Sequence, residues 1–172
     1  AASDVYKRQI LGCMRGPRRG KRRASSSKCS MWNKSFSRKE ASSVAKIVAV
    51  ANQKGGVGKT TTAVNLSSCV AALGKKVLIV DLDPQGNTTT GYGISKRSVD
   101  IGTYEILIGE ADARQAIRKT EFRTDVIGSN TRLAGASLEM IDLPGRESRL
   151  RKALAPIQKD YDFIFIDCPP SL

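Results

Sequence analysis

The sequence predicts an α/β fold in which helices cover both faces of an open, mostly parallel sheet. Apolar runs such as KIVAVAN at 46–52 and KKVLIVDLD at 75–83 are continuous, as in strands buried on both faces. Helical patterns separate these runs, and a glycine-rich turn joins the first run to the first helix. Strands that alternate with helices fold through right-handed crossovers into a parallel sheet.

Four strands are expected in order along the chain. The runs at 46–52 and 75–83 are followed by RTDVIGS at 123–129 and YDFIFIDCPP at 161–170. The last run ends in two prolines, which cannot donate to a sheet ladder.

Three helical segments are expected between the strands. In the segment 59–74, four apolar residues recur at helical spacing: Ala63, Leu66, Val70 and Leu73. Gly74 can end this helix. The segment 103–119 predicts one or two short helices. The segment 147–158 carries one apolar face and is disturbed in its last turn by Pro156; the face consists of Leu150, Ala153, Leu154 and Ile157.

Charge and composition divide the chain into three parts. Residues 1–40 hold twelve Lys and Arg against two acidic residues, whereas residues 41–172 hold seventeen against fourteen. Residues 1–9, AASDVYKRQ, back-translate with permitted codons to a transposon adapter used in preparing sequencing libraries, so we expect them to be translated adapter. The predicted ATPase domain is therefore 45–172.

Residues 10–44 are basic, Ser-rich and without periodicity. They are either a disordered basic arm that adds salt-sensitive phosphate contacts, or upstream sequence translated in frame, with the true start at Met31 or lost. The adapter in front of them favours upstream sequence.

The four cysteines form no metal-type spacing and the chain has no histidine, which argues against a zinc site. No apolar run approaches the length of a membrane span, and none resembles a signal-peptide core. A reduced, cytoplasmic setting is expected.

Candidate site residues gather where the predicted strands end. The glycine-rich turn follows the first strand, Asp81 and Asp83 close the second, and Asp167 closes the last. Ligands of open parallel sheets bind at the carboxyl ends of the strands. These motifs therefore predict one site at one edge of the sheet.

The turn ANQKGGVGKTTT at 51–62 predicts a phosphate-binding loop, although Gln53 replaces the first glycine of the usual pattern. Glycines let the backbone approach phosphates, and a helix N-terminus adds positive potential. Lys59 is expected to contact the β- and γ-phosphates and Thr60 to ligate Mg²⁺. The predicted nucleotide contacts are Gly55, Gly56, Val57, Gly58, Lys59, Thr60 and Thr61.

Residues 54–60, KGGVGKT, resemble the deviant Walker A motif of the ParA/MinD family of P-loop ATPases. The resemblance implies that Lys54 reaches across a nucleotide-sandwich dimer and stabilises charge on the partner's phosphates. A solvated loop lysine is the alternative reading of Lys54.

VDLDPQGN at 80–87 resembles the ParA/Soj branch of this family, whereas MinD-like proteins carry Ile-Gly-Leu-Arg-Asn after the second aspartate. By this resemblance Asp83 positions the attacking water, Asp81 has a structural role, and Asp167 in FIFIDCPP is the Walker B residue that holds Mg²⁺.

The resemblance implies a ParA/Soj-type partitioning ATPase that uses ATP and Mg²⁺, closes a homodimer on ATP, binds DNA nonspecifically on the nucleoid and answers to a ParB-type partner. We expect the chain to be a fragment that lacks the C-terminal part of this fold, with its adenine and DNA contacts, and to be inactive by itself. A MinD-like membrane-associated ATPase and a non-catalytic basic DNA-binding module are the alternatives.

Overall fold

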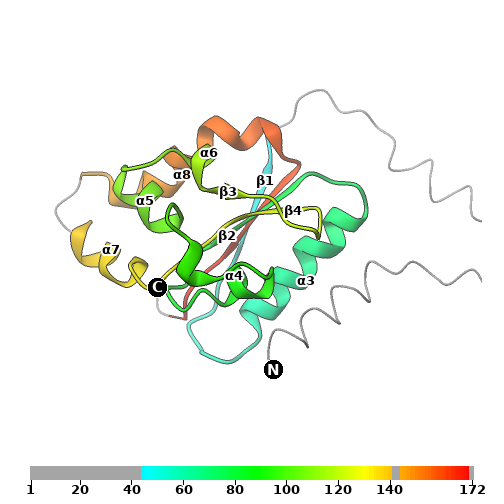
Figure 1. Cartoon of the computed structure of the whole chain (residues 1–172), viewed down its shortest axis with the longest axis horizontal. Coiled ribbons are helices and arrows are strands. Elements are labelled where there is room, and N and C mark those ends of the chain that lie inside the picture. The colour runs from blue at the N-terminus through cyan, green and yellow to red at the C-terminus, as the bar shows by residue number, and fades with distance from the viewer. Residues whose placement is uncertain (1–43, 141–143, 171–172) are drawn as a thin grey trace, which may run out of the picture.

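The computed structural model describes residues 44–140 and 144–170 (Figure 1). The predicted segment 1–9 and nearly all of 10–44 lie outside this range. The described residues form a five-stranded sheet in the order β1-β5-β2-β4-β3. Its strands are β1 (Lys46–Val50), β2 (Val77–Asp81), β3 (Ile117–Arg118), β4 (Thr124–Ile127) and β5 (Phe163–Asp167).

All strand pairs are parallel except β3 with β4, so the predicted mostly parallel sheet is confirmed. The α-helices are α3 (Lys59–Ala72), α4 (Asn87–Gly91), α5 (Thr103–Ile108), α6 (Ala113–Ala116), α7 (Leu133–Glu139) and α8 (Arg149–Leu154). Three 3₁₀ segments accompany them: η1 (Lys96–Ser98), η2 (Arg146–Ser148) and η3 (Ala155–Asp160).

Each face of the sheet buries its own core, because successive side chains of a strand point to opposite faces. In β2, Leu78 and Val80 pack with residues of α5, α6, α8 and η3. Val77 and Ile79 pack on the other face with residues of α3 and with Tyr92 at the end of α4. Helices on both faces are thereby confirmed.

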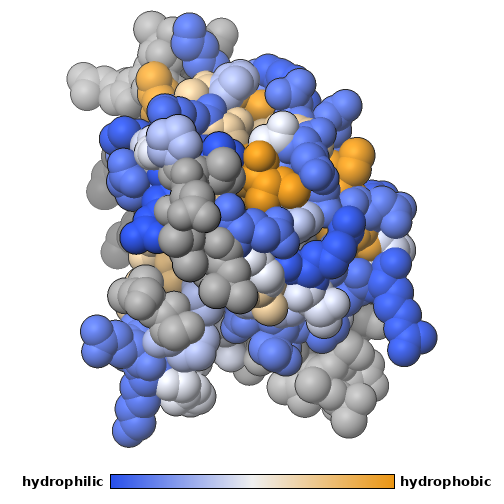
Figure 2. Space-filling view, turned by 90° about the vertical axis from the view of Figure 1, so that its left-hand side faces the viewer, coloured by the Kyte–Doolittle hydropathy of each residue, from blue (hydrophilic) through white to orange (hydrophobic). Residues whose placement is uncertain are grey.

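Figure 2 shows the side of the molecule where α5 and α7 lie in Figure 1. Hydrophobic side chains appear there as separate spots among hydrophilic ones. Scattered apolar side chains are normal on a protein surface. On this side the helical layer covers the sheet.

The prediction that 46–52 is buried on both faces is wrong. The strand ends at Val50, and Ile47 is 43% exposed. The reason is topological: β1 is at the edge of the described sheet and pairs with β5 alone. Such an edge leaves backbone groups and apolar side chains uncovered.

The predicted apolar face of α3 is only partly correct. Ala63 is fully buried, but Leu66 is 43% and Leu73 77% exposed. The buried face instead consists of Ala63, Val64, Ser67, Ser68 and Ala71. Small residues let the helix approach the sheet closely, and Tyr92 Oη lies 2.8 Å from Ser67 Oγ and 2.9 Å from Ser68 Oγ, so these buried hydroxyls are satisfied.

The segment 103–119 forms two short helices, α5 and α6, followed by the strand β3, which the sequence did not predict because two residues show no periodicity. In the segment 147–158, α8 ends at Leu154 and a 3₁₀ segment containing Pro156 follows, as expected. Leu154 and Ile157 are buried in the core.

Candidate functional site

The carboxyl ends of three neighbouring strands lie in register at one edge of the sheet. Val50 and Asp81 both pair with Asp167, from opposite sides of β5. Backbone bonds continue past the strand ends: Leu82 N donates to Asp167 O at 2.9 Å, and Cys168 N donates to Val50 O at 3.1 Å. The motifs predicted to share one edge do so, at the end where the chain turns from β1 into α3 (Figure 1).

The turn from β1 into α3 is an open glycine cradle. Gly56 and Gly58 have φ angles of 71° and 85°, which other residues rarely adopt. A Cβ built on Gly55, Gly56 or Gly58 would meet nothing within 4 Å, so free space lies over the backbone. The first intrahelical bond, from Thr62 N to Gly58 O, measures 2.8 Å. This is the space and helix N-terminus that a phosphate chain requires.

Both lysines of the turn, Lys54 and Lys59, form hydrogen bonds within it. Lys59 Nζ donates to Lys54 O at 3.2 Å, so its ammonium folds back over the turn. Lys54 N donates to Asn52 Oδ1 at 2.9 Å, which fixes the backbone where the turn begins, and residue 54 itself is exposed. Val57 is 45% exposed, while Thr60 and Thr61 are half-buried in the first turn of α3.

Asp167 is fully buried and only half satisfied. Its Oδ2 accepts a hydrogen bond from Thr88 Oγ1 at 2.7 Å, whereas its Oδ1 accepts none. Burial raises the pKa of Asp167; the hydroxyls of Thr88 and Thr60 and the ammonium of Lys59 oppose the rise, and the Asp83 carboxylate adds to it. Thr60, Lys59 and Asp83 are thus close enough to act on this carboxyl.

Asp81 is buried and accepts three hydrogen bonds from neighbouring segments. Its Oδ2 accepts bonds from Thr89 N at 2.8 Å and Thr89 Oγ1 at 2.6 Å, and its Oδ1 accepts one from Asp83 N at 3.1 Å. Burial raises the pKa of Asp81 to about 6, although these three bonds oppose the rise. Asp81 therefore fixes both the backbone of Asp83 and the start of α4.

Asp83 begins the turn that leads into α4. Its Oδ1 accepts a bond from Gln85 N at 2.9 Å and its carbonyl accepts one from Gly86 N at 2.8 Å. Asp83 is half-buried, and its charge acts on the Asp167 carboxyl.

Sequence reasoning missed Thr88 and Thr89. The Thr88 hydroxyl donates a hydrogen bond to the Asp167 carboxylate, and the Thr89 hydroxyl donates one to the Asp81 carboxylate. The run of three threonines directly after the predicted aspartate motif is the sequence feature that could have indicated them, because short hydroxyl side chains are suited to bonding buried carboxylates.

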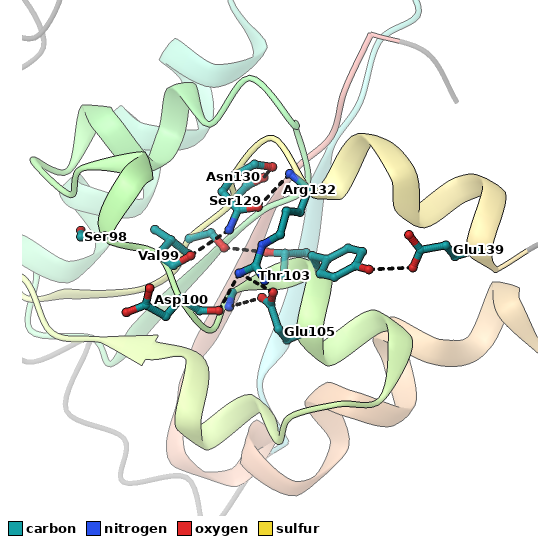
Figure 3. A network of polar contacts seen from close by, with 12 residues as sticks. Ser98, Val99, Asp100, Thr103, Glu105, Ser129, Asn130, Arg132 and Glu139 are labelled. Atoms are coloured by element: carbon teal, nitrogen blue, oxygen red, sulfur yellow. Dashed lines mark hydrogen bonds and ion pairs between the residues drawn. The ribbon is translucent and has the colours of Figure 1, made fainter.

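Figure 3 shows the polar network that holds the loop after β4 against α5. Arg132 pairs with Glu105 at 2.7 Å and donates to Asp100 O at 2.7 Å, while Asn130 Nδ2 donates to Val99 O at 2.8 Å. Glu105 is buried, and its Oε2 accepts a bond from Gly102 N at 2.7 Å. These contacts support the edge of the sheet next to the site.

The network joins the site through Ser129 and through Thr103, whose Oγ1 donates to Asp81 O at 2.7 Å. Ser129 N donates to Thr89 Oγ1 at 2.8 Å, and Thr89 bonds to Asp81. The aspartate segment is thus tied to the loop after β4 as well as to the strand ends.

Chemically, this edge can hold a polyphosphate and a hard divalent cation. The glycine turn offers room and positive potential, Lys59 offers a cation, and Thr60 and the unpaired oxygen of Asp167 offer oxygen ligands. No group of three or more His, Cys, Asp or Glu that could hold a metal occurs in the described part of the chain. Magnesium sites of this kind use few protein ligands together with phosphate oxygens and water.

A protein family described as "AAA domain" matches residues 45–172. The chain belongs to this family.

Curated relatives indicate which type of protein within this family the chain resembles. The sporulation initiation inhibitor protein Soj of Bacillus subtilis is 52% identical over 128 residues, which cover 74% of this chain and 51% of Soj. The chromosome partitioning protein ParA of Myxococcus xanthus is 44% identical over 130 residues, covering 75% of this chain and 46% of that protein. The predicted resemblance to ParA/Soj-type partitioning ATPases is confirmed. The chain spans about half the length of the curated relatives it matches.

Among solved structures, cobyrinic acid a,c-diamide synthase from Mycobacterium smegmatis with bound ATP analog and magnesium is similar, with a TM-score of 0.73 and 40% identity. The match covers 74% of this chain and 52% of that one.

Proposed function

We propose that this chain binds ATP together with Mg²⁺ at the turn into α3 and forms part of a partitioning ATPase of the ParA/Soj type. The observation that carries the proposal is the buried Asp167 carboxyl with one oxygen unpaired, beside Lys59 and Thr60 and next to an open glycine turn. An unpaired buried carboxylate oxygen is costly unless a ligand satisfies it.

The residues of the turn would divide the binding between them. The backbone of Gly55–Gly58 would wrap the phosphates, and Lys59 would leave the Lys54 carbonyl to contact the β- and γ-phosphates. Thr60 and Asp167 would hold Mg²⁺, directly or through water. When bound, the cation would neutralise charge that develops on the transferred phosphoryl group.

Asp83 would orient the attacking water. Its backbone is held by Asp81, its carboxylate acts on Asp167, and its side chain is half-buried beside the cradle. Lys54 is exposed at the rim of the turn and would act on the phosphates of a second subunit when a dimer closes on ATP.

The wider function follows from the resemblance. We propose that the complete protein binds DNA nonspecifically on the nucleoid as an ATP dimer and that a ParB-type partner stimulates hydrolysis. The ParA/Soj form of the aspartate segment favours this over the MinD-like, membrane-associated alternative. Among the described residues, no helix is both long and apolar enough to cross a bilayer.

ATP binding by this chain is the first test. Lys59→Ala removes the cation of the cradle and should weaken ATP binding in the presence of Mg²⁺ by about a hundredfold, since hydrogen bonds to charged groups contribute roughly 1.5–3 kcal/mol each. Asp83→Ala should bind ATP as the wild type does. Isothermal titration calorimetry measures both, and unchanged affinity in Lys59→Ala would refute the proposed site.

The role of Lys54 requires hydrolysis, to be measured in a chimaera that adds the remaining half of Soj. Lys54→Ala and Asp83→Ala should each abolish turnover. Mixed, they form heterodimers with one complete composite site, so activity should recover to at most about half of wild type if the sites act independently. Heterodimers that form without any recovery would assign Lys54 a role within its own loop.

A further inference from the structure

A second cleft opens at the opposite end of the sheet from the glycine turn. Its volume is about 620 Å³. Its lining includes Lys75, Lys76 and Val77, where β2 begins, and Arg123, which directly precedes β4. The candidate ATP site is at the other end of these strands, a full strand length away. The cleft is at the β2–β4–β3 side of the sheet, away from the uncovered edge of β1.

The cleft is strongly basic for a domain of low net charge. Five cationic side chains line it against two carboxylates, and residues 41–172 as a whole carry only three more cations than anions. The cations come from four separate places in the chain and converge only in the fold: they are Lys75, Lys76, Arg114, Lys119 and Arg123.

The two carboxylates of the cleft are already engaged. Asp160 pairs with Arg114 at 2.8 Å. Asp125 pairs with Lys119 and accepts a bond from Tyr161 Oη at 2.7 Å. Burial, together with the bond to Asp125, raises the pKa of Tyr161, so its hydroxyl stays protonated and donates. Lys75, Lys76 and Arg123 form no ion pair within the described residues, which leaves three cations for an anionic ligand.

Arg123 is held in a conformation that side chains rarely adopt. Its φ is 57°, and it is the only described residue other than glycine with a positive φ. The turn before it is fixed by Thr120, whose Oγ1 donates to Thr124 O at 2.7 Å and accepts from Phe122 N at 3.2 Å. Backbone strain of this kind is concentrated at active sites, ligand clamps and switch regions, and Arg123 lines the cleft.

We propose that this cleft is a second anion site that binds a small molecule carrying two or more phosphate groups. A volume of about 620 Å³ lies within the range of small-molecule sites. Lysine and arginine are the side chains that recognise phosphate, as point charges and as a planar fork respectively. A diphosphate is small enough to enter a cleft of this volume, and a rigid DNA duplex is not.

The test measures pyrophosphate binding by calorimetry in the full chain carrying Lys59→Ala, which removes the cation of the other site and so weakens phosphate binding there. Pyrophosphate should bind this protein. Adding Lys75→Glu and Arg123→Glu should weaken its affinity by about tenfold or more, because two charge-assisted contacts become repulsive. The basic segment 1–40 is the same in every variant and cancels in the comparison.

A matched control is Arg146→Glu with Arg151→Glu in the same background, since both residues are exposed, neither lines the cleft, and the pair carries the same charge change. This control should bind pyrophosphate as its parent does. Arg123→Gly offers a variant that the backbone accommodates, because glycine adopts a positive φ freely, and it should weaken binding several-fold while the thermal unfolding midpoint is retained.

Three outcomes would overturn the proposal: no pyrophosphate binding in the Lys59→Ala protein, an equal loss in cleft and control variants, or no loss in the cleft variants. A short DNA duplex serves as the other probe. If the cleft variants lose duplex binding while pyrophosphate affinity is unaffected, the cleft is a nucleic-acid contact and the small-molecule proposal fails. None of these results depends on whether the turn into α3 binds ATP.

Discussion

Gly102 occupies a position where any larger residue forces the neighbouring backbone to move, and Gly102→Ala should be destabilised for that reason. The φ of Gly102 is −147°, an extended conformation open to any residue, so backbone freedom is not the reason for glycine here. The reason is contact: an added Cβ would lie 2.4 Å from Gly128 O and 2.7 Å from Val99 Cγ1. Real Cβ atoms do not approach a carbonyl oxygen so closely, and the backbone must move.

The cost follows from what that movement breaks. Overpacking a buried site destabilises by roughly 1–3 kcal/mol. The hydrogen bond from Thr103 N to Gly128 O, 2.9 Å long, would be lost with it, at roughly 1 kcal/mol. The substitution should therefore lower the free energy of unfolding by about 2–4 kcal/mol and Tm by about 10 °C. Thr103 also donates to Asp81 O at 2.7 Å, so the strain reaches the aspartate segment.

Urea unfolding followed by circular dichroism measures the change, and Gly135→Ala is the matched control. Gly135 lies in α7, and its added Cβ would meet only Glu139 Oε1, at 3.3 Å, at the far end of a long side chain. Alanine favours a helix over glycine by roughly 1 kcal/mol, so this variant should be as stable as wild type or slightly more so. A Gly102→Ala protein with wild-type stability would show that the contact between residues 102 and 128 is not tight in solution.

Two further predictions concern the buried carboxyls. Because burial raises the pKa of Asp81 to about 6, the folded protein holds a proton that the unfolded chain releases near pH 4. This contribution to the free energy of unfolding is present at low pH, and about 3 kcal/mol of it is lost as pH rises through 6. Urea unfolding from pH 4 to 7 should show this decrease in the wild type and not in Asp81→Asn. Equal pH dependence in the two proteins would contradict the prediction. Thr88→Val removes the donor to Asp167 and should raise the Mg²⁺ concentration needed for ATP binding in calorimetric titrations, with Thr88→Ser restoring it. An unchanged Mg²⁺ dependence would show that Thr88 does not position Asp167.

The sequence by itself determined the fold class and the edge on which the candidate site lies. The apolar runs around β2 and β5 were long and continuous, and a parallel topology brings their carboxyl ends together whatever the details of packing. The glycine turn, Asp83 and Asp167 were each readable because the residues of each motif are adjacent in the chain.

Tertiary structure alone decided which apolar side chains are buried. Leu66 and Leu73 fit the helical period as well as Ala63 does, yet they point away from the sheet, since α3 packs through its smallest residues. Ile47 looks like a core residue and is 43% exposed, because β1 pairs with β5 alone among the described strands. Periodicity identifies an apolar face but not the neighbour that covers it.

The same reason explains the contacts that no motif could reveal. Thr88 and Asp167 are 79 positions apart, and Gly102 meets Gly128 across two loops. The basic cleft assembles from four places in the chain, none of which is unusual in composition. Short-range sequence patterns encode strands, helices and turns. Distances between side chains that are remote in sequence are set only when the helices pack on the two faces of the sheet and the loops at each end pack against one another.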